Sequence, residues 1–440
     1  MVNVIIEVSK YLMILLMAVY TYLNFSYFRW KEDWRQNRVC SKQNAAMFIM
    51  HFVAYTILFL KTNDERMILF YLAQVIFFGC YIWLYRLFYR NVSRILVNNM
   101  CMLLCVGFII LSRLSFEKAV RQFLIVAAAA LITWIIPFII DRVWQLVKIP
   151  WVYGILGLLL LVVVWIAGSS SFGAQLALNI GGFSFQPSEF VKISFVFFVA
   201  TMFYRSTDFK TVCVTTVVAA VHVLILVMSK DLGSALLFFV TYLTMLFVAT
   251  TKWMYLLGGL AGGCGASVLA YALFGHVRTR VLAWRNPWAD IDNRGYQITQ
   301  SLFAIGTGGW FGMGLYQGMP YKIPVVEKDF AFAAVSEELG GIFAVCVLLI
   351  CLGCFLQFMM IAGKMQAVFY KLIAFGLGMV YFTQVFLTVG GVIKFIPSTG
   401  ITLPFVSYGG SSILSTVILF GVIQGLYILK KNDEETYEEE

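Results

Sequence analysis

A carboxylate and a lysine stand close together at the start of an apolar segment, in the stretch QPSEFVK at 186–192. Glu189 and Lys192 are three residues apart, so on a helix they share a face. Charged side chains beside an apolar span are costly and therefore indicate function, although a structural salt bridge between the two explains them equally well. This pair is the first candidate for binding a charged ligand.

A second set of candidates lies in the one long hydrophilic stretch, about residues 276–333. Its arginines, Arg280 among them, have the chemistry to bind phosphate through charge-assisted hydrogen bonds. Asp329 stands between a lysine and a phenylalanine, where desolvation raises the pKa of a carboxylate and makes it a usable base. Gln297 and Glu337 are further polar candidates, whereas the aromatic residues here are explained equally by anchoring at a membrane interface.

A third set is the hydroxyl- and glycine-rich stretch at 398–412, which contains Ser407 and Ser411. Glycine and proline at this density interrupt a helix, and such a segment is tolerated within a membrane only where it lines protein or a watery cavity. A cavity lining and a plain loop both remain open. The charged pair Lys230-Asp231 between two apolar runs is explained by a tight turn.

Composition decides what surrounds these residues. Of 440 residues, 61% are hydrophobic and 12% are charged, which is typical of a membrane protein. The apolar runs are continuous rather than alternating, so helices are predicted and a β-barrel is excluded. The net charge of +10 comes from basic residues scattered between apolar runs, which indicates cytoplasmic loops and lipid headgroups and no nucleic acid.

We therefore predict an all-α polytopic membrane protein with about thirteen transmembrane helices. Residues 1–90 form a membrane extension of three helices, 91–430 a core of ten, and 431–440 an acidic cytoplasmic tail that is solvated and disordered. The predicted spans are 4–24, 45–61, 67–85, 95–112, 122–140, 150–168, 188–204, 211–229, 232–250, 253–275, 334–361, 370–393 and 405–429.

Lysine and arginine in the short loops predict the orientation. With the N-terminus outside, the inner loops and C-terminal end hold seventeen of these residues, and the outer loops other than 276–333 hold seven. The bias predicts the N-terminus outside and the C-terminus in the cytoplasm. Residues 276–333 then form an extracellular loop between the seventh and eighth core helices, and loops of this length usually have a function.

The polar stretches together resemble the SEDS family (shape, elongation, division and sporulation), the RodA/FtsW/SpoVE group of peptidoglycan glycosyltransferases. The matching blocks follow one another in the family's order and cover most of 95–430. They are QPSEFVK at 186–192, DLG at 231–233, NPWADIDNRGYQITQSLFAIGTGGWFGMGL at 286–315, DFAFAAVSEELG at 329–340 and STGITLPFVSYGGSS at 398–412.

The resemblance implies an enzyme that polymerises lipid II into glycan strands at the outer face of the cytoplasmic membrane. The family's proposed catalytic aspartate corresponds to Asp329, which would act as a general base in an inverting transfer. Lys192 would hold diphosphate, Glu189 would position it or a metal, and Arg280 matches the family arginine ahead of the NPW block. A divalent cation, magnesium or manganese, and a class B penicillin-binding protein as partner are also implied. The further candidate substrate-binding residues in or next to these blocks are Gln297, Glu337, Ser407 and Ser411.

The chain departs from the family in two outer segments. The Arg-Trp pair that usually follows Gly-Ala is replaced by residues 175–177, Gln-Leu-Ala. The usual Pro-Glu-x-His-Thr-Asp is Pro-Val-Val-Glu-Lys-Asp at 324–329. These changes favour an alternative, a catalytically weak scaffold that activates a penicillin-binding protein. A carrier of lipid-linked precursor is a further alternative, but its related halves are not evident in the sequence.

Overall fold

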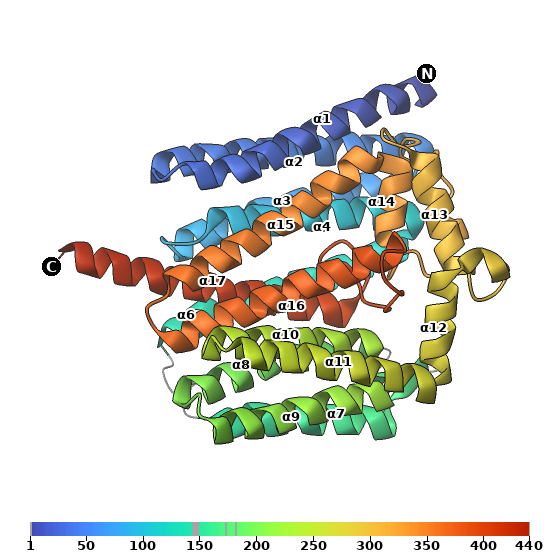
Figure 1. Cartoon of the computed structure of the whole chain (residues 1–440). Helices are drawn as coiled ribbons and strands as arrows, with labels where there is room; N and C mark the ends of the chain where they lie inside the picture. The colour runs from blue at the N-terminus through green and yellow to red at the C-terminus, as the bar shows by residue number, and fades with distance from the viewer. Residues whose placement is uncertain (1, 143–148, 172–173, 181–182, 440) are drawn as a thin grey trace.

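Long helices make up most of the protein, and they run side by side (Figure 1). A computed structural model describes residues 2–142, 149–171, 174–180 and 183–439. The helices that cluster at the end of the molecule opposite the C-terminus are α12, α13 and α14, which belong to the polar stretches singled out above. The fold therefore gathers the candidate chemistry at one end of a helical bundle.

The first three helices pack on the rest of the molecule. They are α1 (Val2–Arg29), α2 (Asp33–Thr62) and α3 (Arg66–Phe88), with α1 lying against α15 and α2 against α4. Buried hydrogen bonds fasten them: Tyr20 donates to Asn99 Oδ1 at 3.1 Å, and Asn99 Nδ2 donates to Asn24 Oδ1 at 2.8 Å. Because buried polar groups require such partners, the contact between extension and core is specific in register.

The remaining described elements follow in chain order around α4, which is buried along its whole span. They are α4 (Arg94–Leu114), α5 (Phe116–Thr133), α6 (Ile136–Arg142), α7 (Pro150–Ala167), β1 (Ser169–Ser171), β2 (Ala174–Ile180), β3 (Phe183–Phe185), α8 (Ser188–Arg205), α9 (Phe209–Met228), α10 (Leu232–Thr250), α11 (Trp253–Leu273), α12 (Gly275–Arg285), η2 (Pro287–Asp290), α13 (Tyr296–Gly308), η3 (Pro320–Lys322), α14 (Ala331–Leu339), α15 (Gly341–Lys364), α16 (Val368–Val392) and α17 (Gly410–Glu439).

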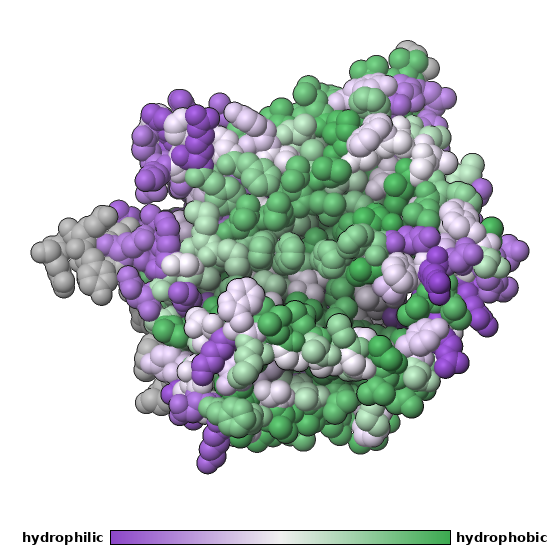
Figure 2. Space-filling model, viewed as in Figure 1, coloured by the Kyte–Doolittle hydropathy of each residue, from purple (hydrophilic) through white to green (hydrophobic). Residues whose placement is uncertain are grey.

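The all-α polytopic membrane class is confirmed. In the described part of the chain, 12 helices are long and apolar enough to cross a membrane. Helix α8, the thirteenth predicted span, is absent from that set, and its 18 residues include the charged Glu189, Lys192 and Arg205. Figure 2 shows an apolar belt with hydrophilic residues gathered at opposite ends, as expected for a protein surrounded by lipid.

Several predicted boundaries were wrong. The span 334–361 is two helices, α14 and α15, which meet at Gly340 with φ +93°. A Cβ at Gly340 would lie 2.5 Å from Gly312 N, because the glycine-rich stretch passes directly beside this break. There the amides of Met313 and Gly314 donate to the carbonyls of Glu337 and Glu338, both at 2.9 Å. The last carbonyls of α14 are thus satisfied by another segment.

Other segments also differ from the prediction. Helix α17 begins at Gly410 rather than near 405 and continues to Glu439, so the acidic tail is helical rather than disordered. The span 122–140 is divided between α5 and α6, and the outer stretch 276–333 contains helices α12 and α13. A small antiparallel sheet, in the order β1-β2-β3, precedes α8 and was not expected in an all-α chain.

Candidate functional site

Glu189 and Lys192 lie on the first turns of α8 and pair with each other. Lys192 Nζ donates to Glu189 Oε2 at 2.5 Å and to Gln384 Oε1 at 2.9 Å. Both side chains are largely buried, with 4% of the lysine and 13% of the glutamate side chain exposed. Ser415 donates a further hydrogen bond to Glu189 Oε2 at 3.0 Å. The pair is therefore a built charge site that joins α8, α16 and α17.

Gln384 connects this pair to the hydroxyl-rich segment 398–412. Its amide nitrogen donates to the Thr402 carbonyl at 3.1 Å and to Ser412 Oγ at 3.4 Å. Thr388, one turn later on α16, donates to the Ile401 carbonyl at 3.0 Å. The segment is non-helical between Pro397 and Gly409. Its carbonyls are satisfied in part by polar side chains of α16, as a non-helical segment at this depth requires.

Asp231 lies at the turn before α10, as expected for a tight turn, and it also contacts the start of α8. Its carboxylate accepts from Ser234 N at 3.1 Å, which caps α10, and from Ser188 Oγ at 3.3 Å. Lys230 has φ +64°, as the sharp turn requires. This contact fixes the QPSE turn against α10.

Asp329 lies in the turns just before α14, beside the same segment 398–412. A Cβ on Gly400 would lie 3.8 Å from Asp329 Oδ2, which places the carboxylate next to this glycine. Among the described residues, no hydrogen bond or ion pair engages the Asp329 carboxylate. Burial raises its pKa above the ordinary value, and the nearby cations Lys328 and Arg280 work in the opposite direction. A half-buried, unengaged carboxylate of raised pKa is suited to accept a proton.

Arg280 reaches the same place from α12. Its Nη1 donates to the carbonyls of Ser398 and Thr399, at 3.4 and 3.2 Å. A guanidinium has five N–H donors, so these bonds orient Arg280 and leave donors for an anion. The backbone of Thr399 also passes close to Gly233 of α10, where an added Cβ would lie 2.8 Å from the Thr399 carbonyl oxygen. The segment 398–412 thus contacts both the Asp329 side and the Lys192 side of the site.

An ion pair holds the chain just ahead of Asp329. Glu327 pairs with Lys118 in the first turn of α5, and its backbone carbonyl accepts from Tyr408 N at 2.7 Å. Glu327 and Lys328 occupy the two positions where the chain departs from the family's His-Thr. The departure therefore brings a new interaction to the segment that carries the candidate base.

The other predicted site residues lie apart from the two charged clusters. Gln297 is exposed in the first turn of α13. Ser407 is 2% exposed, and its hydroxyl accepts from Leu403 N at 3.0 Å. Ser411 accepts from Gln186 N at 2.9 Å and joins the QPSE turn to α17. Glu337 accepts from Met319 N at 2.8 Å and braces the outer stretch. Their contacts stabilise the site's walls, and direct substrate binding by these four residues stays a prediction.

Residues that the sequence reasoning missed include Gln384, Ser415 and the pair Arg113–Glu338. Arg113 Nε donates to Glu338 Oε1 at 2.8 Å, and its guanidinium lies 4.0 Å from the ring centre of Tyr316. Uncharged polar residues inside apolar spans would have indicated Gln384, because such groups require partners in lipid. The partner of Arg113 is 225 positions away, and nothing in the sequence indicates it.

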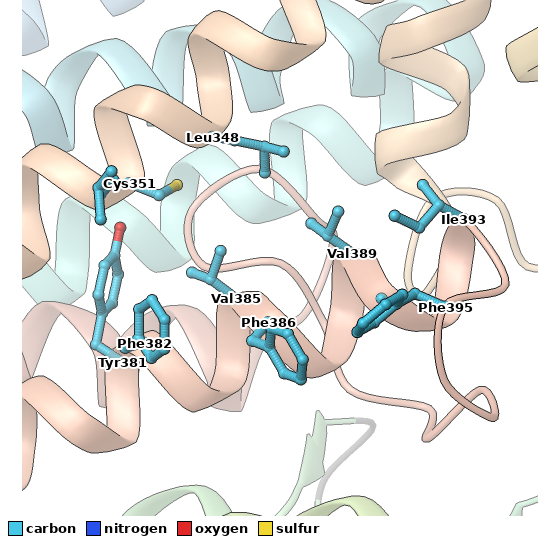
Figure 3. A pocket seen from close by; sticks show the side chains of 11 residues that line it. Leu348, Cys351, Tyr381, Phe382, Val385, Phe386, Val389, Ile393 and Phe395 are labelled. Carbon is cyan, nitrogen blue, oxygen red and sulfur yellow. The ribbon is translucent and has the colours of Figure 1, made fainter.

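An apolar pocket of about 210 Å³ opens between α15 and α16 (Figure 3). The hydroxyl of Tyr381 and the thiol of Cys351 are its polar side-chain groups, and the remaining lining is aliphatic or phenyl. Such a lining offers no carboxylate or cation for glycosyl chemistry. The polar clusters around segment 398–412 therefore form the candidate active site.

The comparisons with known proteins agree with this arrangement. The FtsW/RodA/SpoVE cell cycle protein family matches residues 96–432, which leaves α1–α3 outside the match. Peptidoglycan glycosyltransferase RodA of Mycobacterium tuberculosis is 35% identical over 317 residues, 68% of this chain and 67% of that protein. RodA of Mycobacterium leprae is 30% identical over 423 residues, covering 87% of this chain and 90% of its own. A probable FtsW of Geobacter sulfurreducens is 34% identical over 293 residues, covering 64% of this chain and 78% of its own.

Solved structures show the same fold. A chain in a peptidoglycan synthase complex, described as coordinating polymerization and crosslinking, aligns with a TM-score of 0.65 at 22% identity, covering 78% of this chain and 98% of that one. The crystal structure of Thermus thermophilus RodA aligns with a TM-score of 0.57 at 22% identity, covering 76% and 96%. Since the family match extends over most of the sequence, this protein belongs to the FtsW/RodA/SpoVE family of cell cycle proteins.

Proposed function

We propose that this protein is a peptidoglycan glycosyltransferase that polymerises lipid II into glycan strands at the outer face of the cytoplasmic membrane. Its work would serve cell wall synthesis for cell shape, division or sporulation. One observation carries the assignment: Asp329, unengaged among the described residues and raised in pKa by burial, lies beside a segment that also contacts Arg280 and the Lys192 cluster. A base next to cations is the arrangement that transfer from a diphosphate donor requires.

In the proposed reaction, Asp329 removes the proton from the 4-hydroxyl of the acceptor sugar. That oxygen attacks the anomeric carbon of the strand donor from the face opposite the diphosphate. The new glycosidic C–O bond forms as the bond to the diphosphate breaks, so the anomeric centre inverts. Undecaprenyl diphosphate leaves with the bonding electrons, and the cations Arg280 and Lys192 stabilise its charge.

The arrangement suits a divalent cation that arrives with the substrate. Among the described residues, no group of three or more histidine, cysteine or acidic side chains lies together as a metal cage. Magnesium is commonly held by one or two carboxylates together with substrate phosphates, and manganese favours similar oxygen ligands. Glu189, which has a second carboxylate oxygen besides the one bonded to Lys192 and Ser415, would be the protein ligand. Bound there, the cation would neutralise charge on the departing diphosphate.

The proposal includes a partner and an orientation. The partner is a class B penicillin-binding transpeptidase, supported by the similarity to a chain from a peptidoglycan synthase complex. The N-terminus lies outside and the C-terminus in the cytoplasm, supported by the lysine and arginine bias between loops. Asp329 then faces the outer side, where the lipid II sugar is polymerised.

The scaffold alternative is favoured by one observation, the absence of the Arg-Trp pair after Gly-Ala. Ala174 is the first residue of β2 and Gly173 lies outside the described residues. Purified protein with a transpeptidase-inactive partner, lipid II and magnesium or manganese decides between the two. We expect polymer from the wild type and none from Asp329→Asn, which is nearly isosteric. No polymer from either would favour the scaffold, and polymer from both would remove Asp329 from the catalytic role.

A further inference from the structure

A small pocket lies where the N-terminal extension meets the core, far from Asp329. It sits at the turn between α3 and α4, beside the last part of α17, where Asn91 donates to Asn432 Oδ1 at 3.1 Å. This end of the molecule carries the C-terminus, and α12–α14 lie at the other end (Figure 1). The residues that line it are Ile82, Tyr85, Arg86, Val92, Arg94, Val97 and Asn98.

The pocket has two cations and no acid. Arg86 comes from the end of α3 and Arg94 from the start of α4, and neither forms an ion pair in the described part of the chain. The Nη2 atom of Arg86 is buried there with no hydrogen-bond partner. Two like charges repel, and a buried N–H without an acceptor costs free energy. A bound anion would remove both penalties.

Asn98 adds a second unfilled position in the same pocket. It is 1% exposed, and its Nδ2 donates to the Cys40 carbonyl at 2.9 Å and to Gln43 Oε1 at 3.2 Å. Its Oδ1 is buried without a donor among the described residues. The pocket thus combines guanidinium donors for an anion with an acceptor for a hydroxyl. The N-terminus of α4, which has no side-chain cap, adds partial positive charge.

We propose that this pocket binds the headgroup of an anionic phospholipid, with the phosphodiester on Arg86 and Arg94 and a glycerol hydroxyl on Asn98. Basic pockets between membrane helices recognise such headgroups. The same end of α3 exposes the apolar side chains Trp83 and Phe88, 60% each, which offer acyl chains a surface. In the proposed orientation the lipid belongs to the cytoplasmic leaflet. It would join the extension to the core.

The test measures lipid binding and does not depend on glycosyltransferase activity. Full-length protein in a neutral detergent is titrated with phosphatidylglycerol, and bound lipid is counted by native mass spectrometry beside thermal unfolding. A charge-assisted hydrogen bond contributes about 1.5–3 kcal/mol, so Arg86→Gln and Arg94→Gln should each weaken binding about tenfold or more. Arg90→Gln is the matched control, because Arg90 is exposed in the same turn and does not line the pocket. It should change binding less than about twofold.

Each outcome decides the proposal. Selective binding of phosphatidylglycerol over phosphatidylcholine, lost in the two pocket variants and kept in the control, supports it. Equal binding by wild type and variants overturns it, as does an equal loss in Arg90→Gln, which would indicate diffuse attraction to the surface. Stabilisation by inorganic phosphate alone, matching that by lipid, would overturn the lipid assignment. The single variants are assayed separately, so misfolding of one leaves the other as the test.

Discussion

The ion pair between Lys118 and Glu327 allows a direct test of how Asp329 is held. Glu327 is two residues ahead of Asp329, and its backbone carbonyl accepts a hydrogen bond from Tyr408 N at 2.7 Å. The Lys118 side chain is 43% exposed and that of Glu327 17%. The pair therefore ties the segment of the proposed base to α5 while remaining partly in solvent. We expect reversal of either charge to displace Asp329.

The expected magnitudes separate stability from catalysis. A partly exposed ion pair contributes about 0.2–1 kcal/mol to stability, so either single variant should lower the unfolding temperature only slightly. Displacing a catalytic group by ~1 Å costs up to ~10²-fold in rate, which corresponds to about 2.7 kcal/mol in activation free energy. Lys118→Glu and Glu327→Lys should each lower kcat for polymerisation by about 10- to 100-fold.

The decisive variant is the double exchange, Lys118→Glu with Glu327→Lys, which restores the pair with its charges reversed. It should recover most of kcat when each protein is assayed at its own pH optimum. Reversing the exposed pair Arg294–Asp290, with side chains 59% and 40% exposed, is the matched control in the same outer stretch. That control should leave kcat unchanged.

A double exchange no more active than the single variants would refute the positioning role. Loss of activity that follows loss of thermal stability in every variant would refute it equally, because a purely structural pair would give that correlation. Unchanged kcat in Lys118→Glu would show that the Tyr408 contact and local packing alone hold the segment.

Three further predictions concern the same machinery. Lys192→Ala removes the buried cation proposed to hold diphosphate, so the lipid II concentration for half-maximal rate should rise about tenfold or more in steady-state polymerisation assays. Asp329 must be deprotonated to act as a base and burial raises its pKa, so kcat should fall as pH falls through a value above the ordinary range. Glu327→Gln removes a negative charge that raises this pKa, and the acid limb of the pH–rate profile should shift to lower pH. Arg113→Met leaves Glu338, whose side chain is 1% exposed, without its cation; it should cost about 3–5 kcal/mol and lower the unfolding temperature more than the double variant with Glu338→Gln does.

The sequence alone determined the membrane class, the approximate positions of the spans and the family. Continuous apolar runs admit only helices in lipid, so composition and run length were sufficient. Motif spacing also named the main candidates, since Glu189 and Lys192 are local neighbours whose pairing follows from helix geometry. Lys230-Asp231 was correctly predicted as a turn for the same local reason.

Only the tertiary structure decided what lies beside these residues. Gln384 contacts Lys192 across 192 positions, and Glu327 meets Lys118 across 209. The break at Gly340 depends on a glycine-rich segment that approaches its backbone from elsewhere in the chain. Hydropathy reports how a residue partitions into lipid, and it contains no information about which helices pack together. Contacts between distant helices follow from side-chain packing and hydrogen bonding, and these are fixed when the whole bundle assembles.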